Sequence, residues 1–580
     1  MHTTKIVCTL GPASASRETI AALADAGMTL ARFNASHGSP DERAALIEQV
    51  RDVDAATEPS VATLLDLPGP EIRTAPHEGA ITLEEGSTIR FVAGETTTPE
   101  EVGLSTPITG VESGDRVLLD DGRIEAAVEE SEGSTVRARV DSGGPLDGRT
   151  GVNVPGVDLG LDVLTDADRR ELDLAADADV DFVAASFVRS ADDIYAVNEA
   201  LEARDAAIPV IAKIERADAV TNLAGIVEAV DGVMVARGDL GVECPLEEVP
   251  LIQKRIIRRC HAAGVPVITA TEMLDSMTHA RRPTRAEASD VANAVLDGTD
   301  AVMLSAETAV GDHPVQVVKA MGKLVGEIEA SAEYAEGVER MVPKPGDSRT
   351  GALARSARYL ARDTDAAAIV AATESGYTAR KAAKYRPDVP VVAVTPDDRV
   401  RRRLGLAAGV IPRYAPLTGP NENADAVIRN AVQAALDAGV ADPGDTVVVL
   451  AGMMTDLEGA NTTNTLKLHV AAEILATGRS VVGGRVSGPL HRTPDGDLAE
   501  LPEGAVLSLP ADFDDEFDGD PARLGGIASA HGGVTGYPAI VAREVGLPMI
   551  ADASLPEVAE GNRVTLDAGR GVVYEGDVGG

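Results

Sequence analysis

Cysteine is scarce in this sequence. The three cysteines, Cys8, Cys244 and Cys260, are an odd, scattered set without the spacing of a zinc site or a disulfide framework. This pattern suits a reducing compartment, so we expect a cytoplasmic protein. Long apolar runs are also missing: none is long enough to cross a bilayer, and no signal peptide precedes Lys5. We therefore expect no membrane partner.

Positive charge is in short supply as well. Against 93 Asp and Glu the 580 residues hold 52 Lys and Arg, giving a formal net charge of −41. Such a chain would repel phosphates, which argues against nucleic acid as a partner. Aromatic residues make up only 2%, and acidic chains poor in aromatics are sometimes disordered. However, 44% hydrophobic residues suffice for several globular domains, so a highly solvated surface suited to a salty cell interior is the better interpretation.

Lysine is rare too, and Lys213 is the only one between Lys5 and Lys254. The chain otherwise uses arginine for positive charge. A lysine kept at the end of an apolar run therefore suggests a compact charge directed at a small group. Glu215 follows two residues later, and the two side chains could simply form an ion pair at the rim of a barrel. For this short motif alone, we favour the ion pair.

The whole stretch from Ile211 to Glu243 favours a functional site instead. Its second apolar run ends in Arg237, Gly238 and Asp239. Burying a charge is costly unless it is paired or metal-bound. Glu215 and Asp239 supply the hard oxygen ligands that Mg²⁺ prefers. Gly238 allows a ligand to approach the backbone closely, and N–H groups at the start of a following helix favour an anion.

Apolar, β-branched runs alternate with Ala-rich amphipathic stretches such as Ser16–Ala26, which predicts a (β/α)8 barrel. The predicted strands are Lys5–Thr9, Thr29–Phe33, Val61–Asp66, Asp181–Phe187, Pro209–Ile214, Gly232–Ala236, Pro266–Thr271 and Ala301–Ser305. Nearly every run ends in polar residues. The carboxyl ends of barrel strands meet at one mouth, where such enzymes place their active sites. Capping or turn formation would explain any one of these ends, but not all of them together.

The alternation is interrupted and later resumes. Residues 74–164 are rich in Gly, Thr and Val with repeated turn signals, which predicts a small all-β insert able to act as a lid. After a linker at Pro343–Asp347, a new α/β pattern begins. Its predicted strands are Ala366–Ala371, Val391–Val394, Val410–Ile411 and Thr446–Leu450. The first strand leads into the turn Thr373–Thr378, which either cradles a phosphate at a helix N-terminus or merely caps the helix.

Six motifs, in order along the chain, resemble those of the pyruvate kinase family. They are Leu10-Gly11-Pro12, Ala31–Gly38, Gly69–Thr74, Lys213-Ile214-Glu215, Val235–Gly241 and Arg282–Asn293. The resemblance extends from Lys5 to about Ala472 and is highly specific. It implies transfer of the phosphoryl group of phosphoenolpyruvate to ADP, giving pyruvate and ATP.

The resemblance also implies roles for individual residues. Lys213 and Arg32 would face the migrating phosphoryl group, whose charge must be neutralised during transfer. Glu215 and Asp239 would hold Mg²⁺. The backbone N–H groups around Gly238 and Asp239, with Thr271, would receive the substrate carboxylate. Protonation of the enolate carbon would run through Thr271, Ser305, Glu307 and water.

The remaining roles concern K⁺, the nucleotide and assembly. By resemblance, a K⁺ site is formed by Asn34, Ser36, Asp66 and the carbonyl of Leu67. His37 and Arg73, with Asn34, would contact ADP or ATP. The turn would bind a phosphorylated effector through Thr373, Ser375, Gly376 and Thr378. Family members that require K⁺ resemble this chain in having a glutamate, here Glu71, after Gly-Pro. A homotetramer is expected from the resemblance alone.

Two features depart from the family pattern. A lysine common before Gly-Val-Asn is Thr150 here, with Arg149 beside it, which puts the lid's contribution to nucleotide binding in doubt. The chain also continues beyond the usual end of the family, into a segment that resembles the swivelling phosphohistidine domain of phosphoenolpyruvate-utilising enzymes. In the aligned signature Gly532–Glu544, the phosphorylated histidine is replaced by Tyr537, and His531 lies too far upstream to substitute. We expect a folded module that cannot transfer phosphate.

Two other functions are considered. A phosphoenolpyruvate synthase or dikinase would need an ATP-grasp module and a phosphorylatable histidine, and the sequence offers neither. A non-catalytic metabolite sensor should have lost Lys213, Glu215 or Asp239, but all three are present. The expected domains are a catalytic barrel (1–73 and 165–342), a lid (74–164), an α/β regulatory domain (348–472) and a phosphohistidine-like domain (479–580).

Overall fold

The computed structural model describes residues 2–57, 60–79, 81–346, 348–416, 424–452, 463–555 and 558–578. The chain divides into two compact units, and each is described by itself. The first unit comprises Met1–Gly351, Glu374–Asp388 and Asp397–Tyr414; the second comprises Ala352–Thr373, Val389–Pro396 and Ala415–Gly580. No helix in the described ranges is both long and apolar enough to cross a membrane.

Eight parallel strands close into a barrel in the first unit, in the order β1-β17-β16-β15-β14-β13-β3-β2. They are β1 (Lys5–Thr9), β2 (Met28–Asn34), β3 (Ala62–Asp66), β13 (Phe182–Ala185), β14 (Val210–Ile214), β15 (Gly232–Ala236), β16 (Val267–Ala270) and β17 (Ala301–Leu304). Each overlaps a predicted strand, so the predicted (β/α)8 barrel is confirmed. Almost every strand residue is buried because helices cover the barrel.

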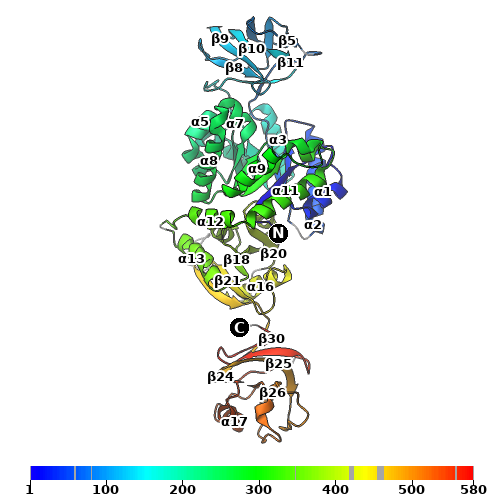
Figure 1. Ribbon diagram of the computed structural model, residues 1–580, viewed down its shortest axis with the longest axis vertical. Coiled ribbons are helices and arrows are strands. Elements are labelled where there is room, and N and C mark those ends of the chain that lie inside the picture. Colours follow the sequence, from blue (N-terminus) through cyan, green and yellow to red (C-terminus); the bar gives the residue numbers. More distant parts are fainter. Residues whose placement is uncertain are drawn as a thin grey trace. The chain divides into compact units, whose positions relative to one another are not determined.

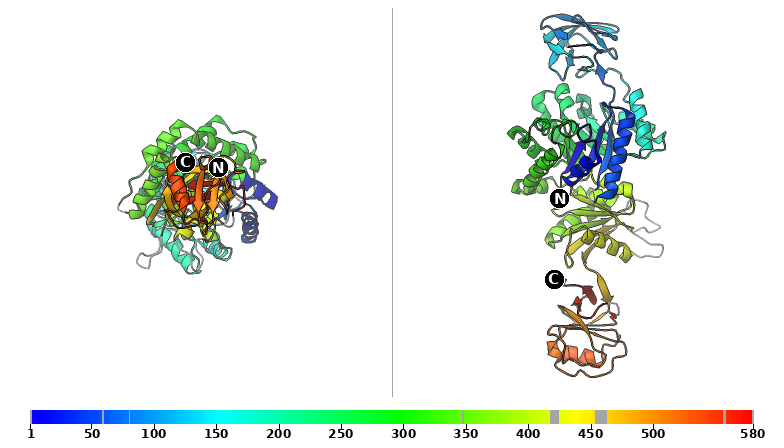
Figure 2. Two further views of the ribbon diagram at one scale, coloured as in Figure 1. Left: turned by 90° about the horizontal axis from the view of Figure 1, so that it is seen from below. Right: turned by 90° about the vertical axis from the view of Figure 1, so that its right-hand side faces the viewer.

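Helices surround the barrel, as Figures 1 and 2 show. They are α1 (Arg17–Asp25), α2 (Pro40–Ala56), α3 (Asp166–Asp177), α4 (Ala191–Glu202), α5 (Ala217–Thr221), α6 (Leu223–Ala229), α7 (Arg237–Glu243), α8 (Val249–Ala263), α9 (Arg285–Leu296), α10 (Ala306–Ala309), α11 (Pro314–Glu329) and α12 (Ala332–Met341). Several of these helices begin with a side-chain cap, which fixes the residue at which the preceding loop ends. The Ser16 hydroxyl accepts the Thr19 N–H, and the Thr165 hydroxyl accepts the Asp168 N–H. The caps hold the loops at the barrel ends in a defined geometry.

The insert between β3 and α3 forms its own β-structure with a separate apolar core. Its strands are β4 (Ile72–Arg73), β5 (Ile81–Leu83), β6 (Thr88–Ala93), β7 (Glu101–Leu104), β8 (Arg116–Leu119), β9 (Ile124–Glu132), β10 (Thr135–Ser142), β11 (Gly144–Leu146) and β12 (Gly151–Asn153). Seven of them form one sheet, and β5 pairs with β11. The predicted all-β character of the insert is confirmed.

The α/β part that follows comprises α13 (Arg349–Asp363), β18 (Ala368–Ala372), α14 (Tyr377–Ala383), β19 (Val391–Thr395), α15 (Asp398–Leu404), β20 (Val410–Tyr414), α16 (Ala424–Asp437), β21 (Thr446–Ala451) and β22 (Thr465–Val470). In the second unit, β18 pairs in parallel with β19 and β21. The edge strand β22 runs antiparallel to β21 and was not predicted from the sequence. Lys467 and His469 interrupt its apolar residues, so this edge strand lacks the continuous apolar run of the core strands.

The α14 and α15 segments belong to the first unit and are attached to the N-terminal ends of the barrel strands. Lys5 Nζ donates to the Val410 carbonyl over 2.7 Å. Arg402 Nε donates to Asp181 Oδ1 over 3.0 Å, at the start of β13. These buried polar contacts attach β20 and α15 to the barrel end opposite the mouth.

The last module forms an eight-stranded sheet in the order β23-β30-β29-β25-β26-β27-β28-β24. Its elements are β23 (Ile474–Thr477), β24 (Arg479–Val482), β25 (Arg485–Arg492), β26 (Val506–Leu509), β27 (Gly526–Ser529), α17 (Tyr537–Val545), β28 (Met549–Ala551), β29 (Arg563–Asp567) and β30 (Val572–Glu575). Ala539 and Ala542 of α17 pack with Leu507 and Ile527 of the sheet, and Figure 2 shows this helix in orange. The helix is therefore fixed by an apolar face of its own module.

Candidate active site

The ammonium group of Lys213 lies among three oxygen atoms at the C-terminal ends of the barrel strands. Its Nζ is 2.8 Å from Glu215 Oε1 and 3.3 Å from Asp66 Oδ1, and it donates to Ser186 Oγ over 2.7 Å. Burial alone would lower the pKa of Lys213. The carboxylates of Asp66 and Glu215 outweigh burial and raise that pKa above its ordinary value. Lys213 therefore stays protonated at neutral pH.

Asp66 joins Lys213 to a second cation. Both Nε and Nη2 of Arg32 lie 2.6 Å from Asp66 Oδ2, while Nη1 donates to Thr9 Oγ1 over 3.0 Å. Although burial opposes it, the charges of Lys213 and Arg32 hold the pKa of Asp66 below its usual range. The ionised carboxylate thus holds two positive groups, one from β2 and one from β14, which β3 and β13 separate in the barrel.

Glu215 and Asp239 supply negative charge next to these cations. Glu215 is buried, and its Oε2 accepts the N–H of Phe187 over 2.6 Å. Burial, together with the charge of Glu215, raises the pKa of Asp239 to about 7. Two nearby carboxylates repel each other when both are ionised. A bound divalent cation would relieve this repulsion, so the pair suits such an ion. No cluster of three His, Cys, Asp or Glu occurs in the described ranges, so other ligands would have to complete the coordination shell.

The backbone after β16 is strained. Thr271 and Glu272 have φ of +67° and +53°, a left-handed conformation unusual for a β-branched residue. Two contacts hold it: Arg237 Nη2 donates to the Thr271 carbonyl over 2.7 Å, and the Gly238 N–H donates to Thr271 Oγ1 over 2.9 Å. The strain is therefore maintained by the start of α7, next to Asp239. The sequence predicted a strand continuing to Thr271, but β16 ends at Ala270.

Glu307 and Ser305 connect two strand ends. The buried carboxylate of Glu307 accepts the N–H of Ser305 over 2.6 Å and that of Leu274 over 3.1 Å. Burial raises the pKa of Glu307 even though these N–H groups oppose the shift. Each oxygen of this carboxylate therefore accepts a backbone N–H. In this way Glu307 links the end of β17 to the loop that follows Thr271.

The four residues expected to bind K⁺ lie at the ends of β2 and β3. Asn34 and Asp66 are register partners in the sheet. Asn34 Oδ1 accepts the Ser36 N–H over 3.1 Å, and the Leu67 carbonyl accepts the Ser186 hydroxyl over 2.7 Å. Among the described residues, buried Asp66 Oδ1 has no hydrogen-bond partner. This oxygen, which is ion-paired with the Lys213 ammonium at 3.3 Å, forms with nearby amide, hydroxyl and carbonyl oxygens a set chemically suited to a monovalent cation.

A cavity of ≈ 820 Å³ opens beside Arg32 and also contains Asn34, His37 and Ser305. Its volume is in the range of small-molecule sites. Arg73 is not one of its lining residues. Instead, Arg73 Nη2 lies 2.7 Å from Glu71 Oε2, and Nη1 donates to the carbonyl of Arg149 over 2.9 Å. Arg73 therefore ties Glu71 to the end of the β-insert.

The two departures from the family pattern are both held by local hydrogen bonds. The Thr150 hydroxyl donates to the Asp147 carbonyl over 2.8 Å, so it stays within its own turn. In the last module, Tyr537 is the first residue of α17, and its hydroxyl accepts the Phe517 N–H over 3.3 Å. His531 Nδ1 accepts the Gly533 N–H over 2.8 Å on the preceding loop. Tyr537 and His531 thus lie at different places on the turn.

The expected effector turn leads directly into α14. Thr373 is buried, and its N–H donates to the Val394 carbonyl over 3.0 Å. Gly376 has φ of +78° at the N-terminus of the helix, whereas Ser375 is exposed. Thr378 is buried in the first turn of the helix.

Sequence reasoning assigned no individual role to three residues that shape the site, although it placed Ser186 at a strand end facing the barrel mouth. Thr9 orients Arg32, Ser186 links Lys213 to the Leu67 carbonyl, and the left-handed Phe187 (φ +56°) presents its N–H to Glu215. Their only signal in the sequence was a position at or just after a predicted strand.

The chain is similar to known proteins along its whole length. Residues 1–318 match the model "Pyruvate kinase, barrel domain", 351–469 match "Pyruvate kinase, alpha/beta domain", and 501–571 match "PEP-utilising enzyme, mobile domain". A pyruvate kinase of Geobacillus stearothermophilus is 42% identical over 99% of this chain and 98% of its own length. Those of Bacillus licheniformis and Staphylococcus aureus (strain USA300) are each 40% identical over 99% of both chains.

Proposed function

Because the chain belongs to the pyruvate kinase family, we propose that it transfers the phosphoryl group of phosphoenolpyruvate to ADP, giving pyruvate and ATP. The pairing of Lys213 and Arg32 on one buried carboxylate is the observation that carries this proposal. Phosphoryl transfer needs positioning and charge neutralisation more than covalent chemistry. Two fixed cations at a barrel mouth meet that need.

In this mechanism, Lys213 and Arg32 face the phosphoryl group, and Asp66 keeps their positions. The N–H groups of Gly238 and Asp239, with the Thr271 hydroxyl, receive the substrate carboxylate. The Gly238 N–H and the Thr271 hydroxyl already contact each other over 2.9 Å, so both lie where one oxyanion would meet them. Thr271, Ser305, Glu307 and water carry the proton to the enolate carbon, and Glu307 also holds the backbone of this path.

The family generally requires a divalent and a monovalent cation, and we propose Mg²⁺ and K⁺. Glu215 and Asp239 would hold Mg²⁺, which would supply charge stabilisation for the migrating phosphoryl group. Asn34, Ser36, Asp66 and the Leu67 carbonyl would hold K⁺. Asp66 Oδ1, which accepts no hydrogen bond from the described residues and lies 3.3 Å from Lys213 Nζ, supports this assignment.

ADP would occupy the cavity beside Arg32, where Asn34 and His37 reach it. Arg73 does not line this cavity. It would reach the nucleotide only after its ion pair with Glu71 breaks. Thr150 supplies no charge, so the nearby Arg149 is the cation that the end of the insert offers.

We further propose a homotetramer in the cytoplasm, with a phosphorylated effector bound by Thr373, Ser375, Gly376 and Thr378. The domain limits given above also remain our proposal. For the last module, Tyr537 in place of histidine supports a role in packing or assembly rather than in phosphate transfer.

A coupled assay tests the proposed function directly. Pyruvate formation from phosphoenolpyruvate and ADP is followed in molar KCl with Mg²⁺, since the acidic surface favours high salt. Formation that depends on both substrates is expected. A preparation that binds phosphoenolpyruvate but forms no pyruvate under these conditions would support the metabolite-sensor alternative.

A further inference from the structure

A second cavity, of ≈ 210 Å³, lies at the N-terminal ends of the barrel strands, away from the reaction site. Phe182 begins β13, and Pro209, Asp231 and Pro266 directly precede β14, β15 and β16. The opposite wall comes from the α14 and α15 segments. Its lining residues are Ser375, Arg380, Val400, Arg403, Leu406 and Ala407. All of these residues belong to the first unit.

The two arginines of this cavity lack carboxylate partners. Among the residues that the structure describes, the guanidinium group of Arg380 makes no hydrogen bond or ion pair; only its backbone is bonded, within α14. Arg403 donates from Nη2 to the Ala207 carbonyl over 2.9 Å, but its buried Nε has no acceptor. By contrast, Arg399, Arg401 and Arg402 of the same helix α15 are each paired with an aspartate. Two uncompensated arginines are conspicuous in a chain with a net charge of −41.

The surroundings make the positive charge costly. Arg403 is half-buried, and burial lowers its pKa; the pKa of Arg380 is lowered in the same direction, although Arg380 is exposed to solvent. Asp231 is the one carboxylate that lines the cavity, and it accepts the Val210 N–H over 3.3 Å. Asp179 and Asp181 act on Arg403 from a distance, but they pair with Arg399 and with Arg51 and Arg402. An added anion would therefore compensate charge that the protein leaves unpaired.

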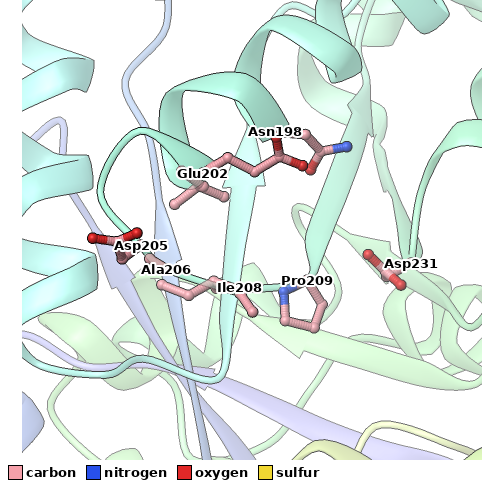
Figure 3. Close-up of a pocket in the computed structure, with 9 residues that line it drawn as sticks. Asn198, Glu202, Asp205, Ala206, Ile208, Pro209 and Asp231 are labelled. Carbon is pink, nitrogen blue, oxygen red and sulfur yellow. The ribbon is translucent and has the colours of Figure 1, made fainter.

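A neighbouring hollow has the opposite character. Figure 3 shows this hollow, of ≈ 500 Å³, which shares Pro209 and Asp231 with the cavity described above. Its charged lining residues are Glu202, Asp205 and Asp231, with no lysine or arginine. Such a surface would repel an anion, so of these two hollows the arginine-lined cavity is the one suited to an anion.

We propose that Arg380 and Arg403 bind a phosphate group in this cavity, either inorganic phosphate or the phosphate of a small phosphomonoester. Guanidinium groups match phosphate oxygens in a bidentate manner. The cavity is smaller than the roughly 300–1,000 Å³ of typical ligand pockets, so it suits phosphate with few further atoms. Ser375 lines it, and a Cβ at Gly376 would lie 3.2 Å from Arg380 Nη1, so the arginine reaches back to the turn. The inference rests on the proposal that the turn Thr373–Thr378 binds a phosphorylated effector. It places the phosphate on the side of this turn that lines the cavity with the barrel strands.

Residue-resolved arginine modification tests the site on the full chain. Phenylglyoxal is applied with inorganic phosphate, glycerol 3-phosphate or glycerol at matched ionic strength, and peptides are analysed by mass spectrometry. Phosphate should slow modification of Arg380 and Arg403 but not of Arg399, whose side chain pairs with Asp179. Protection by both phosphates identifies a phosphate site, and protection by glycerol 3-phosphate alone identifies a phosphomonoester site. Equal rates with and without both phosphates overturn the proposal.

A matched pair of variants provides the second measurement. In Arg380→Gln, the dissociation constant of the protecting phosphate should rise about tenfold, as expected for loss of a charge-assisted contact. Arg399→Gln removes one positive charge nearby and should leave the constant unchanged; equal constants in the two variants contradict the proposal. Turnover is measured on the same preparations. If the enzyme forms pyruvate but phosphate does not protect the two arginines, only this site is refuted. If phosphate protects them but the enzyme forms no pyruvate, only the proposed function is refuted.

Discussion

At the residue scale, Asp66 organises the site. One of its oxygens binds Arg32, while the other lies 3.3 Å from Lys213 and is otherwise free. The sequence predicted this residue as a K⁺ ligand from resemblance alone. Its contacts to both cations depend on the closeness of β2, β3 and β14 in the barrel, which no local sequence pattern specifies.

Replacing Lys213 tests the role of the fixed cation. Lys213→Ala should lower kcat by about a thousandfold or more, because its charge acts chiefly in the transition state. Lys213→Arg keeps the charge between the two carboxylates and serves as the control for folding. Steady-state kinetics separate the effects: a raised KM at unchanged kcat would contradict the assignment. Divalent-metal binding, measured separately, should remain.

Glu71 bears on the requirement for a monovalent cation. It forms an ion pair with Arg73 at the start of the β-insert. We expect activity to rise with K⁺ at constant ionic strength, and Glu71→Lys to reduce this dependence by supplying a positive charge. Rates are compared in K⁺ and in a bulky organic cation. Equal rates in the two cations would rule out a K⁺ requirement.

His261 makes the stability of the first unit sensitive to acid. Burial, aided by the charge of Arg386, lowers its pKa from 6.5 to about 4, and its Nε2 lies 2.8 Å from the Lys384 carbonyl. Below pH 6.5 His261 binds a proton in the unfolded chain but stays neutral in the folded chain. The free energy of unfolding therefore falls as the pH drops toward 4. The loss amounts to roughly 3 kcal/mol.

Urea unfolding across this pH interval measures the effect. His261→Gln should flatten the pH dependence, because glutamine does not titrate. His279→Gln, at an exposed histidine, should leave the wild-type slope unchanged. The same slope in both variants would show that other groups govern the acid sensitivity.

At the scale of elements, the sequence predicted the core better than the edges and turns. All eight barrel strands were anticipated because buried parallel strands are continuous apolar runs. β22 was missed because polar residues interrupt its apolar ones, so it lacks the continuous apolar run of a buried strand. The left-handed backbone at Thr271 was missed because it depends on Arg237 and Gly238, which lie far away in the sequence.

The start of α17 determines the chemistry of the last module. Tyr537 stands where the related signature has histidine, and its ring packs 5.5 Å from that of Phe517. Incubation with labelled phosphoenolpyruvate should therefore leave no acid-labile phosphate on residues 479–580. His531→Ala provides the check, since label that appears on the tail and disappears in this variant would assign transfer to His531.

At the scale of the whole molecule, the last module should contribute stability or assembly rather than catalysis. β23 pairs with β30, so a truncation is best placed before Ile474, with β22 intact. The shortened chain should unfold at a lower temperature or assemble differently while retaining pyruvate formation. Calorimetry, light scattering and the coupled assay report these properties. Loss of turnover in a folded, normally assembled truncation would assign the module a catalytic role.

The scarcity of lysine around Lys213 has a practical consequence. A protease that cuts after lysine releases residues 6–213 and 214–254 as two fragments, and their junction lies in the middle of the site. In the folded chain, the protonated ammonium between Glu215 and Asp66 should resist acylating reagents. Acylation at Lys213 prevents that cut and joins the two fragments into one peptide. The mass of a single digest product therefore reports whether the Lys213 ammonium is enclosed or released.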